Sequence, residues 1–220
     1  MIAIVIPAYN AADTISSLLW RLSQYVDKNA MIVVDDGSRD NTAELAKKYS
    51  TTLLQHDRNK GKGAALRTAF EHCRVNKSIE AVITMDADLQ HRPEELPQFF
   101  EAWRNLRTDI IIGSRRRENS SMPFHRKVSN SITSYLVSVR TRQRIPDSQS
   151  GYRLLSKRVI DSVRFESDGY EAETEILIDA ASMGFTIGSV PIETIYNEAR
   201  SSMTYWHTTK SFLKVLLKEY

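Results

Sequence analysis

Cysteine is the scarcest residue in this 220-residue sequence, where Cys73 stands alone. A single cysteine cannot form a disulfide within the chain, and its isolation fits a reducing compartment such as the cytoplasm. Cys73 follows Leu66, Ala69 and Phe70 at helical spacing. We therefore expect it to pack in the core rather than to act as a reactive thiol.

Long hydrophobic runs and a strong charge imbalance are also missing. No apolar run approaches the ~18 residues that a membrane-spanning helix needs. The opening residues Met1 to Pro7 lack the basic leader and cleavage site of a secretion signal. The 30 basic and 27 acidic residues leave a net charge of only +3. These features predict a soluble cytoplasmic protein, long enough for one large domain or for a domain with an appendage.

The sequence does contain a regular alternation of short apolar runs with helical stretches. Strands are predicted at residues 2–6, 31–34, 51–54, 81–86, 109–114 and 185–192. Helices are predicted from Asp13 or Thr14 to Val26, from Asn41 or Thr42 to Tyr49, from Gly63 to Cys73, from Pro93 to Trp103, and over 125–139, 171–183 and 205–220. Residues 119–123 are expected to form a mobile loop. The pattern predicts an α/β fold with a mostly parallel, doubly wound sheet and helices on both faces.

Polar motifs follow the predicted strands at their carboxyl ends. They lie at residues 7–10, 35–38, 59–63, 86–90 and 113–117. The carboxyl ends of parallel strands meet at one edge of a doubly wound sheet, and ligands bind beyond that edge. We therefore expect these motifs to converge on a single site.

The most informative of these motifs is Asp86-Ala-Asp88. In an extended chain both carboxylates point the same way, and they repel each other unless a positive charge lies between them. With the amide oxygen of Gln90 they suit Mg²⁺ or Mn²⁺, leaving room for phosphate oxygens. The alternative is a solvated turn with helix-capping acids before Pro93, and the convergence of motifs favours the metal. His91 is expected to be an exposed turn residue.

Seven segments carry a resemblance to a known family. In order they are Ile6-Pro-Ala-Tyr-Asn10, Val33-Val-Asp-Asp-Gly-Ser38, Asn59-Lys-Gly-Lys-Gly-Ala64, Met85-Asp-Ala-Asp-Leu-Gln90, Gly113-Ser-Arg115, Asp147-Ser-Gln-Ser-Gly-Tyr-Arg153 and Tyr170-Glu-Ala-Glu-Thr-Glu175. The chain resembles the family 2 glycosyltransferases of GT-A (Rossmann-like) fold, and within them the dolichyl- and polyprenyl-phosphate sugar synthases with their bacterial relatives. The resemblance covers residues 2 to about 200 and implies a GT-A domain over 1–205, and the residue pattern predicts an amphipathic helix over 206–220. The resemblance also implies inverting, metal-assisted transfer of a sugar from a UDP-, GDP- or dTDP-linked donor.

The first four segments are expected to bind the donor. Pro7 and Tyr9, with Ala8 between them, can form a wall for the nucleobase. Asp36 can accept hydrogen bonds from the base edge, whereas Asp35 is expected to hold its own loop.

The diphosphate is expected to meet the glycine-rich turn and the acidic motif. Gly61 and Gly63 allow the backbone to approach a ligand closely. Lys60 and Lys62 offer positive charge, and Lys62 is the better placed. The resemblance assigns the metal and diphosphate to a further set of residues: Asp86, Ala87, Asp88 and Gln90. Asp88 ranks first among them as a metal ligand.

The acceptor remains open between a phosphate and a hydroxyl. A lipid phosphate is already largely ionised near neutral pH, because the second pKa of a phosphomonoester is about 6, so it needs cations rather than a base. The candidates to bind it are Arg115, Arg126, Lys127, Ser129, Asn130 and Arg153, and the family pattern favours Arg115. A hydroxyl acceptor needs a general base. The candidates for that role are Asp147, Glu173 and Glu175, and the family pattern favours Glu175.

The basic segment and the last helix each have two interpretations. Residues 115–144 hold eight basic residues and one acid, Glu118. They fit either an acceptor site or a solvated face, whereas nucleic acid is disfavoured because aromatics do not interleave with the charges. The lysine stripe of the last helix, Lys210, Lys214 and Lys218, fits either an anionic membrane surface or a helix that packs on the domain.

The favoured function is an inverting, metal-dependent glycosyltransferase that acts on a polyprenyl phosphate from the cytoplasmic side of a membrane. The nearest rival transfers sugar to a hydroxyl of a glycan or lipid in cell-envelope polysaccharide synthesis. A nucleotidyltransferase and a non-catalytic binding protein are less favoured, and a homo-oligomer is compatible with the sequence. After residue 200 the chain departs from the family pattern, although Arg200 and Ser202 can still reach a diphosphate.

Overall fold

The computed structural model describes residues 1–49, 52–115, 124–193 and 205–218, and for 124–127 and 205–210 it describes the backbone alone. A seven-stranded sheet runs through its centre in the order β3-β2-β1-β4-β6-β5-β7. The strands are β1 (Ile2–Ala8), β2 (Met31–Asp35), β3 (Thr52–Gln55), β4 (Ala81–Thr84), β5 (Ile110–Arg115), β6 (Arg153–Ser156) and β7 (Ile187–Ile192). Among these strands β6 alone is antiparallel to its neighbours, β4 and β5. The mostly parallel α/β sheet predicted from the sequence is confirmed.

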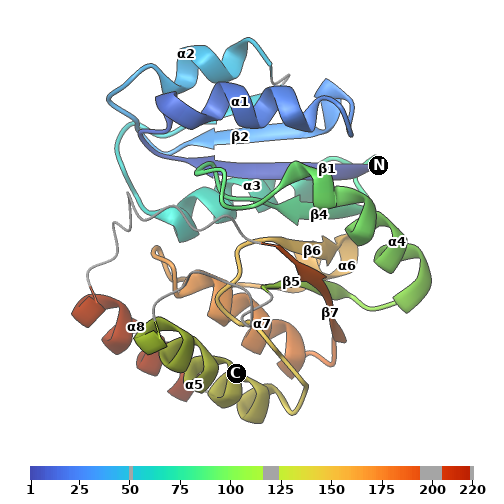
Figure 1. Ribbon diagram of the computed structural model, residues 1–220, viewed down its shortest axis with the longest axis vertical. Coiled ribbons are helices and arrows are strands. Elements are labelled where there is room, and N and C mark those ends of the chain that lie inside the picture. The colour runs from blue at the N-terminus through green and yellow to red at the C-terminus, as the bar shows by residue number, and fades with distance from the viewer. Residues whose placement is uncertain (50–51, 116–123, 194–204, 219–220) are drawn as a thin grey trace.

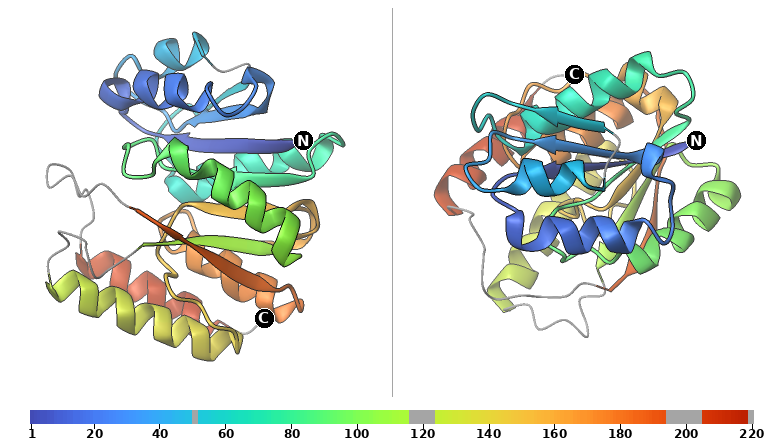
Figure 2. Two further views of the ribbon diagram at one scale, coloured as in Figure 1. Left: turned by 45° about the vertical axis from the view of Figure 1, so that its right-hand side comes forward. Right: turned by 90° about the horizontal axis from the view of Figure 1, so that it is seen from above.

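Helices cover both faces of this sheet (Figures 1 and 2). They are α1 (Ala12–Leu22), α2 (Thr42–Lys47), α3 (Lys62–Val75), α4 (Leu96–Leu106), α5 (Phe124–Thr141), α6 (Lys157–Ser162), α7 (Ala172–Ser182) and α8 (Tyr205–Leu217). Short 3₁₀ turns, η1 (Lys28–Ala30) and η2 (Pro93–Glu95), precede β2 and α4. Each predicted helix is found, with ends shifted by a few residues.

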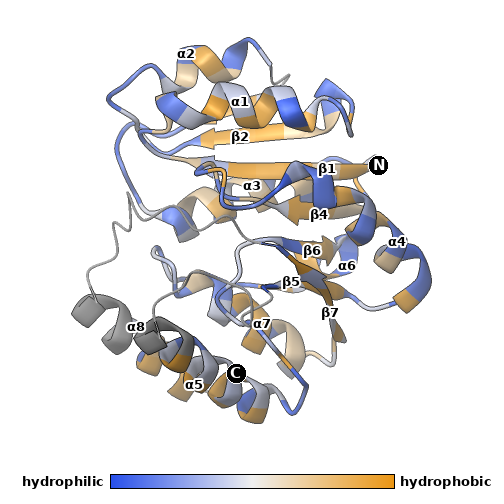
Figure 3. Cartoon of the chain, viewed as in Figure 1, coloured by the Kyte–Doolittle hydropathy of each residue, from blue (hydrophilic) through white to orange (hydrophobic). Residues whose placement is uncertain are grey.

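The alternation of side chains along the strands divides the core into two layers. Ala3 and Val5 of β1 face the cluster formed with α3, α6 and α7. Ile4 and Ile6 face the opposite cluster, formed with α1 and α4. All four side chains are fully buried, and Figure 3 shows the central strands as the most hydrophobic ribbons. A strand buried on both faces explains why its sequence reads as a continuous apolar run.

Two local expectations at the start of the chain are wrong. Strand β1 does not stop before Pro7 but continues to Ala8, pairing Pro7 with Val34. Helix α1 is not capped by Asp13 or Thr14, because it begins at Ala12 and makes no side-chain cap of its own. The exposed amides are instead satisfied from the loop after β2. Asp40 accepts a hydrogen bond from the Ala12 amide at 3.1 Å, and Thr42 accepts one from the Ala11 amide at 2.8 Å.

Cys73 and the last helix behave as core elements. Burial raises the pKa of the Cys73 thiol to about 11, against a small opposing effect of Lys157, so the thiol stays protonated and packs as predicted. Helix α8 packs against α7 and α5, and it buries Phe212 and Val215. Within the described residues, no helix combines the length and apolarity needed to cross a membrane.

Candidate functional site

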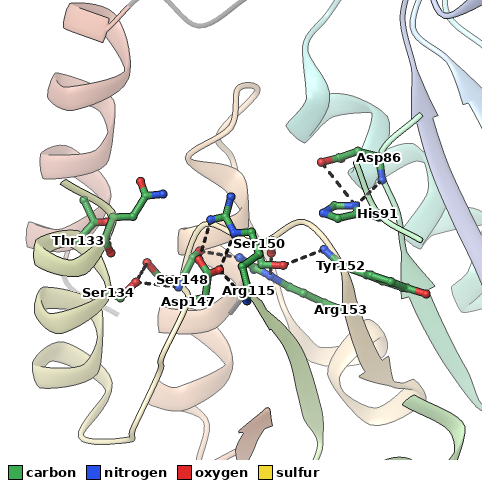
Figure 4. Close-up of polar contacts among 11 residues, drawn as sticks. Asp86, His91, Arg115, Thr133, Ser134, Asp147, Ser148, Ser150, Tyr152 and Arg153 are labelled. Atoms are coloured by element: carbon green, nitrogen blue, oxygen red, sulfur yellow. Dashed lines mark hydrogen bonds and ion pairs between the residues drawn. The ribbon is translucent and has the colours of Figure 1, made fainter. Parts of the chain in front are cut away.

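The carboxyl ends of β1, β2, β4 and β5 meet at one edge of the sheet, as the polar motifs predict. Because β6 is antiparallel, its beginning lies at this same edge, with Arg153 opposite Thr84 of β4. The Thr84 hydroxyl donates a hydrogen bond to the Gly151 carbonyl at 2.8 Å. The loop over residues 147–152 is thereby placed beside the acidic motif (Figure 4).

A lysine joins two carboxylates at the centre of this edge. The Lys62 ammonium forms ion pairs with Asp86 and with Glu173, whose Oε1 lies 2.8 Å away. The Lys62 side chain is only 13% exposed and that of Glu173 only 9%. Burial works against the charge on Lys62, but the two carboxylates outweigh it and raise the pKa of the ammonium. The glycine-rich turn therefore supplies a positive charge between Asp86 and Glu173, whereas the sequence predicted one between Asp86 and Asp88.

Gly151 is the residue that lets this cluster close. A Cβ at this position would lie 2.8 Å from a Glu173 carboxylate oxygen and 2.9 Å from both Asp86 Oδ2 and Lys62 Nζ. Any side chain here would push the three charged groups apart. Gly151 lies in one of the seven family-like segments, but nothing in its local sequence marks it as the point where these charges meet.

The acidic motif itself is a turn rather than an extended strand. Strand β4 ends at Thr84, and Leu89 adopts a left-handed conformation with φ of 63°. Burial acts to raise the pKa of Asp86, but Lys62 outweighs it and lowers that pKa. Burial and then the charge of Asp86 raise the pKa of Asp88. The two carboxylates are therefore electrostatic neighbours, and Lys62 acts more strongly on Asp86 than on Asp88.

This donor set fits a divalent metal that is shared with a ligand. Asp88 accepts a hydrogen bond from the Gln90 amide at 3.0 Å, which orients its carboxylate. Within the described part of the chain, no group of three or more His, Cys, Asp or Glu side chains forms a closed metal site. Two carboxylates and an amide oxygen leave several positions for phosphate oxygens and water, as Mg²⁺ and Mn²⁺ require.

His91 is not the exposed turn residue expected from the sequence. It is 5% exposed and stacks against Tyr152 with ring centroids 5.2 Å apart. Its Nδ1 accepts a hydrogen bond from the Asp86 amide at 3.2 Å, which requires the proton of the neutral ring to be on Nε2. Burial lowers the pKa of His91 against the pull of the two aspartates. The prediction failed because the turn folds back against the 147–152 loop.

Asp36 holds the loop over 59–61. Its Oδ1 lies 2.6 Å from His56 Nδ1 and accepts the Lys60 amide at 2.9 Å, while its Oδ2 accepts the Gly61 amide at 2.8 Å. The residue is 3% exposed. Contact between Asp36 and a nucleobase stays a prediction, and both its oxygens already serve the protein. Asp35 holds its own loop as expected, accepting the Ser38 amide at 3.1 Å.

The two glycines of the basic turn meet the protein's own backbone. Gly61 has φ of 98°, and a Cβ there would clash with the Asp168 carbonyl. Gly63 donates a hydrogen bond to the same carbonyl at 2.6 Å, and its missing Cβ leaves room for Ser167. Both glycines approach the segment before α7 closely, and the predicted approach of a ligand to them stays a prediction.

Arg115 and Asp147 form a fixed pair next to the cluster. Arg115 Nε and Nη2 donate to the two carboxylate oxygens of Asp147 at 2.6 and 2.8 Å. Asp147 is fully buried, whereas the Arg115 side chain is 16% exposed. The charges of Asp86 and Glu173 also act on Arg115. A buried, doubly paired carboxylate is poorly placed to take a proton from an acceptor, and the role of Asp147 as a base stays a prediction.

Arg153 is held by the protein's own backbone, and its contact with an acceptor stays a prediction. It is 2% exposed, and its guanidinium donates to the carbonyls of Ser150 and Ser148 at 2.7 Å each, and to that of Glu173. Burial lowers its pKa. The predicted acceptor-binding arginine is a buried brace for the 147–152 loop, because three backbone carbonyls converge on it.

Glu175 lies outside the cluster, and its role as a base stays a prediction. Its side chain is 2% exposed, accepts the Ser167 amide at 2.9 Å and pairs with Lys218, just after α8, at 2.8 Å. Burial opposes its ionisation, but the hydrogen bonds from Lys218 and Ser167 outweigh it and lower its pKa. Of the acids in the 170–175 segment, Glu173 is the one brought to Lys62.

Pro7, Ala8 and Tyr9 lie at the carboxyl end of β1. Tyr9 is 45% exposed, Pro7 is half-buried and Ala8 is buried, and their role as a wall for the nucleobase stays a prediction. The carbonyls of Ser129 and Asn130 on α5 each accept a hydrogen bond from a threonine hydroxyl at 3.1 Å. The side chains of four further candidates lie outside the described residues: Arg126, Lys127, Arg200 and Ser202.

Comparison with known proteins places the chain in a family. A sequence model of glycosyl transferase family 2 matches residues 3–164. The UDP-N-acetylglucosamine–dolichyl-phosphate N-acetylglucosaminyltransferase of Methanococcus voltae is 31% identical over 90% of this chain and 87% of its own length. The undecaprenyl-phosphate mannosyltransferase of Micrococcus luteus is 31% identical over 90% of this chain and 85% of its own length.

A solved structure supports the same placement at the level of fold. Glucosyl-3-phosphoglycerate synthase from Mycobacterium tuberculosis, in complex with Mn²⁺, UDP and phosphoglyceric acid, has a TM-score of 0.80 to this chain. The match covers 99% of this chain and 77% of that one at 22% sequence identity, and it confirms the predicted GT-A-like fold. The chain therefore belongs to glycosyl transferase family 2 and is a glycosyltransferase.

Proposed function

We propose that this glycosyltransferase moves a sugar, with inversion, from a nucleotide-diphosphate donor to a polyprenyl-phosphate acceptor, with Mg²⁺ or Mn²⁺ as cofactor. The observation that supports a phosphate as the acceptor is the Arg115–Asp147 pair. It presents a partly exposed guanidinium at the site, while both favoured candidates for a general base, Asp147 and Glu175, are engaged elsewhere. The names of the relatives from Methanococcus voltae and Micrococcus luteus point to the same kind of acceptor.

The donor is proposed to lie across the ends of β1 and β4. Tyr9 and Pro7 flank the nucleobase, and Asp86, Asp88 and Gln90 hold the metal. When bound, the metal offsets the negative charge that develops on the departing diphosphate. The related solved structure contains UDP, which supports a UDP-linked sugar as the donor of this protein.

Lys62 is proposed to change partners when the donor binds. Without ligand it lies between Asp86 and Glu173. If Asp86 turns to the metal, Glu173 keeps the ammonium in place at 2.8 Å. The lysine then offers its charge to the diphosphate from a fixed position. Less free energy is therefore needed to order the lysine side chain during the reaction.

Arg115 is proposed to bind the acceptor phosphate. Both ends of the reaction are anionic, so an acceptor phosphate approaching the donor needs a cation that is already oriented. The bidentate contact with Asp147 orients the guanidinium and limits its rotation. Ser129, Asn130, Arg126 and Lys127 of α5 remain candidates for further contacts.

The second candidate function is transfer to a hydroxyl of a glycan or lipid. The observation that favours it is Glu173, an acid at the centre of the cluster that is the remaining candidate for a general base. Asp147→Asn cannot separate the two functions, because loss of Asp147 would release Arg115 in either case. Glu173→Gln keeps a hydrogen-bond acceptor for Lys62 while removing the base. A hydroxyl acceptor then predicts a loss of about 10²- to 10⁴-fold in kcat, and a phosphate acceptor a much smaller one.

The donor half of the proposal is tested by a thermal-shift panel of UDP-, GDP- and dTDP-sugars with and without Mn²⁺. A matching donor stabilises the folded state by mass action. Because the metal is proposed to hold the donor, the melting temperature of the protein should rise only when Mn²⁺ is present. Asp88→Asn should abolish that rise. If no donor stabilises the protein, or if stabilisation does not need Asp88, the proposed donor site is wrong.

A further inference from the structure

One face of α5 presents a row of apolar side chains to solvent. Val128, Ile132, Tyr135 and Val139 are 41%, 54%, 68% and 59% exposed. Their spacings of four, three and four residues place them on one stripe of the helix. At 1.5 Å per residue the stripe is about 17 Å long. Single exposed hydrophobic residues are ordinary on protein surfaces, but a continuous row marks a surface that is covered in function.

The opposite face of α5 is anchored beside the proposed acceptor site. Val137 is fully buried in the core. The Ser134 hydroxyl accepts a hydrogen bond from the Ser148 amide at 3.1 Å, and Figure 4 shows this contact next to the pair formed by Asp147 and Arg115. Whatever covers the stripe is therefore held at a fixed orientation to Arg115.

The sequence segment that carries the stripe has charges of one sign. Residues 119–146 contain no Asp or Glu, and they contain five arginine or lysine residues, at positions 126, 127, 140, 142 and 144. Of these, Arg140 and Arg142 at the end of the helix are exposed. Such a segment favours an anionic surface and disfavours a second copy of itself, because a symmetric dimer through this face would bring two basic segments together.

The neighbouring helix α8 adds exposed apolar and basic side chains at the same end of the molecule. Helix α8 lies beside α5 in both views (Figures 1 and 2) and contacts it. It exposes Leu213 and Leu217, at 46% and 78%, together with the Lys214 side chain. Its other face, which carries Phe212 and Val215, is buried against the domain. The two interpretations of the last helix are thus compatible, since one face packs and the other is exposed.

We propose that the α5 stripe docks on the surface of an anionic lipid bilayer. Helix α5 lies in the plane of the membrane surface, with Val128, Ile132, Tyr135 and Val139 inserted among the lipids and the basic residues at the headgroups. This inference deepens the proposed function, because a polyprenyl phosphate is carried in the membrane and its headgroup would then meet the protein at the edge that bears Arg115. It assigns the main contact to α5 rather than to residues 206–220.

The test measures vesicle binding by the full chain, without donor or acceptor. The protein is co-sedimented with vesicles of phosphatidylcholine, with or without a third of phosphatidylglycerol. The test variant is Ile132→Glu/Tyr135→Glu, whose exposed side chains leave the core intact, and circular dichroism verifies its fold. The matched control is Trp20→Glu, because Trp20 on α1 is 58% exposed and α1 lies at the other end of the molecule (Figure 1).

The expected result is binding to the anionic vesicles that weakens as salt rises. The partition coefficient of the double variant on these vesicles should be at least roughly tenfold lower than that of the wild type, because the variant replaces apolar contact with charge repulsion. The Trp20 variant should bind like the wild type. Three results would overturn the proposal: no binding to either vesicle, equal binding by the double variant, or a wild-type dimer that the double variant dissociates, which would show that a second copy covers the stripe. Because no transfer is measured, a failure here leaves the proposed reaction standing.

Discussion

Replacing Lys62 with methionine should strengthen binding of the bare metal and weaken binding of the nucleotide. The Lys62 ammonium is the cation that Asp86 contacts in the structure, and it is 13% exposed against 29% for Asp86. A divalent ion must therefore compete with an ammonium already in place. Methionine keeps an unbranched apolar side chain, one atom shorter than that of lysine, and removes the ammonium with its charge and its hydrogen-bond donors.

The size of the effect follows from Coulomb's law with an effective dielectric constant for a partly buried site. Two unit charges about 4 Å apart at a dielectric constant of about 20 interact by about 4 kcal/mol. Solvent screening reduces the net gain for the metal to about 1–2 kcal/mol, or about 5- to 30-fold in affinity. The same unpaired acids should lower the stability of the metal-free variant by about 2–4 kcal/mol.

The assay is titration of Mn²⁺ by calorimetry or electron paramagnetic resonance, in the absence and presence of UDP. In Lys62→Met, Mn²⁺ alone should bind more tightly and should raise the melting temperature more than in the wild type, while UDP should bind more weakly. Lys60→Met is the matched control, because Lys60 pairs with an exposed partner, Asp57, at 2.8 Å. Unchanged or weaker Mn²⁺ binding in Lys62→Met would refute the competition between the lysine and the metal.

Three further predictions concern the surroundings of the cluster. Gly151→Ala should cut donor binding at least tenfold while leaving the fold intact, because its Cβ would lie within 2.9 Å of three charged groups; calorimetry measures the first and circular dichroism the second. Glu175→Gln should lower the urea-unfolding free energy by about 1.5–3 kcal/mol at neutral pH, whereas Glu166→Gln, whose side chain is 87% exposed, should change it little. Because the pKa of Glu175 is lowered in the folded state, its contribution is present above the ordinary pKa of a glutamate and should disappear as the pH falls through the lowered value; a difference between the two variants that persists in acid would contradict this. Asp147→Asn and Arg115→Met should each reduce transfer, and the double variant should lose little more than the worse single one, because the two act as a pair; additive losses in a kinetic double-mutant cycle would show separate roles.

The arrangement of the strands was predictable because it depends on local patterns. Apolar runs at residues 2–6, 31–34 and 81–86 are long enough for a buried strand, and their polar ends identified the edge that carries the site. The reversal of β6 was not predictable, since it depends on pairing with β4 and β5 across more than 40 residues of chain. That reversal is what brings Gly151 to Asp86.

The types of side chain at the site were predictable, but their partners were not. Glu173 and Glu175 are two positions apart, and on a helix they point to nearly opposite sides, so the phase of α7 decides which one meets Lys62. Arg153 and Asp36 carry the charge expected of ligand-binding residues, but buried carbonyls and amides of distant loops engage them. A sequence motif shows that a charged side chain is present, whereas long-range packing determines which groups pair with it.

The direct test of the proposed reaction is a transfer assay with a defined acceptor. The protein, Mn²⁺ and each of the UDP-, GDP- and dTDP-sugars are incubated with undecaprenyl phosphate or with undecaprenol, and the lipids are analysed by mass spectrometry. The proposal predicts a lipid-linked sugar phosphodiester with at least one donor, formed only from the phosphate, dependent on Mn²⁺ and lost in Asp88→Asn and Arg115→Met. Transfer to undecaprenol or to a glycan hydroxyl in place of the phosphate would contradict it.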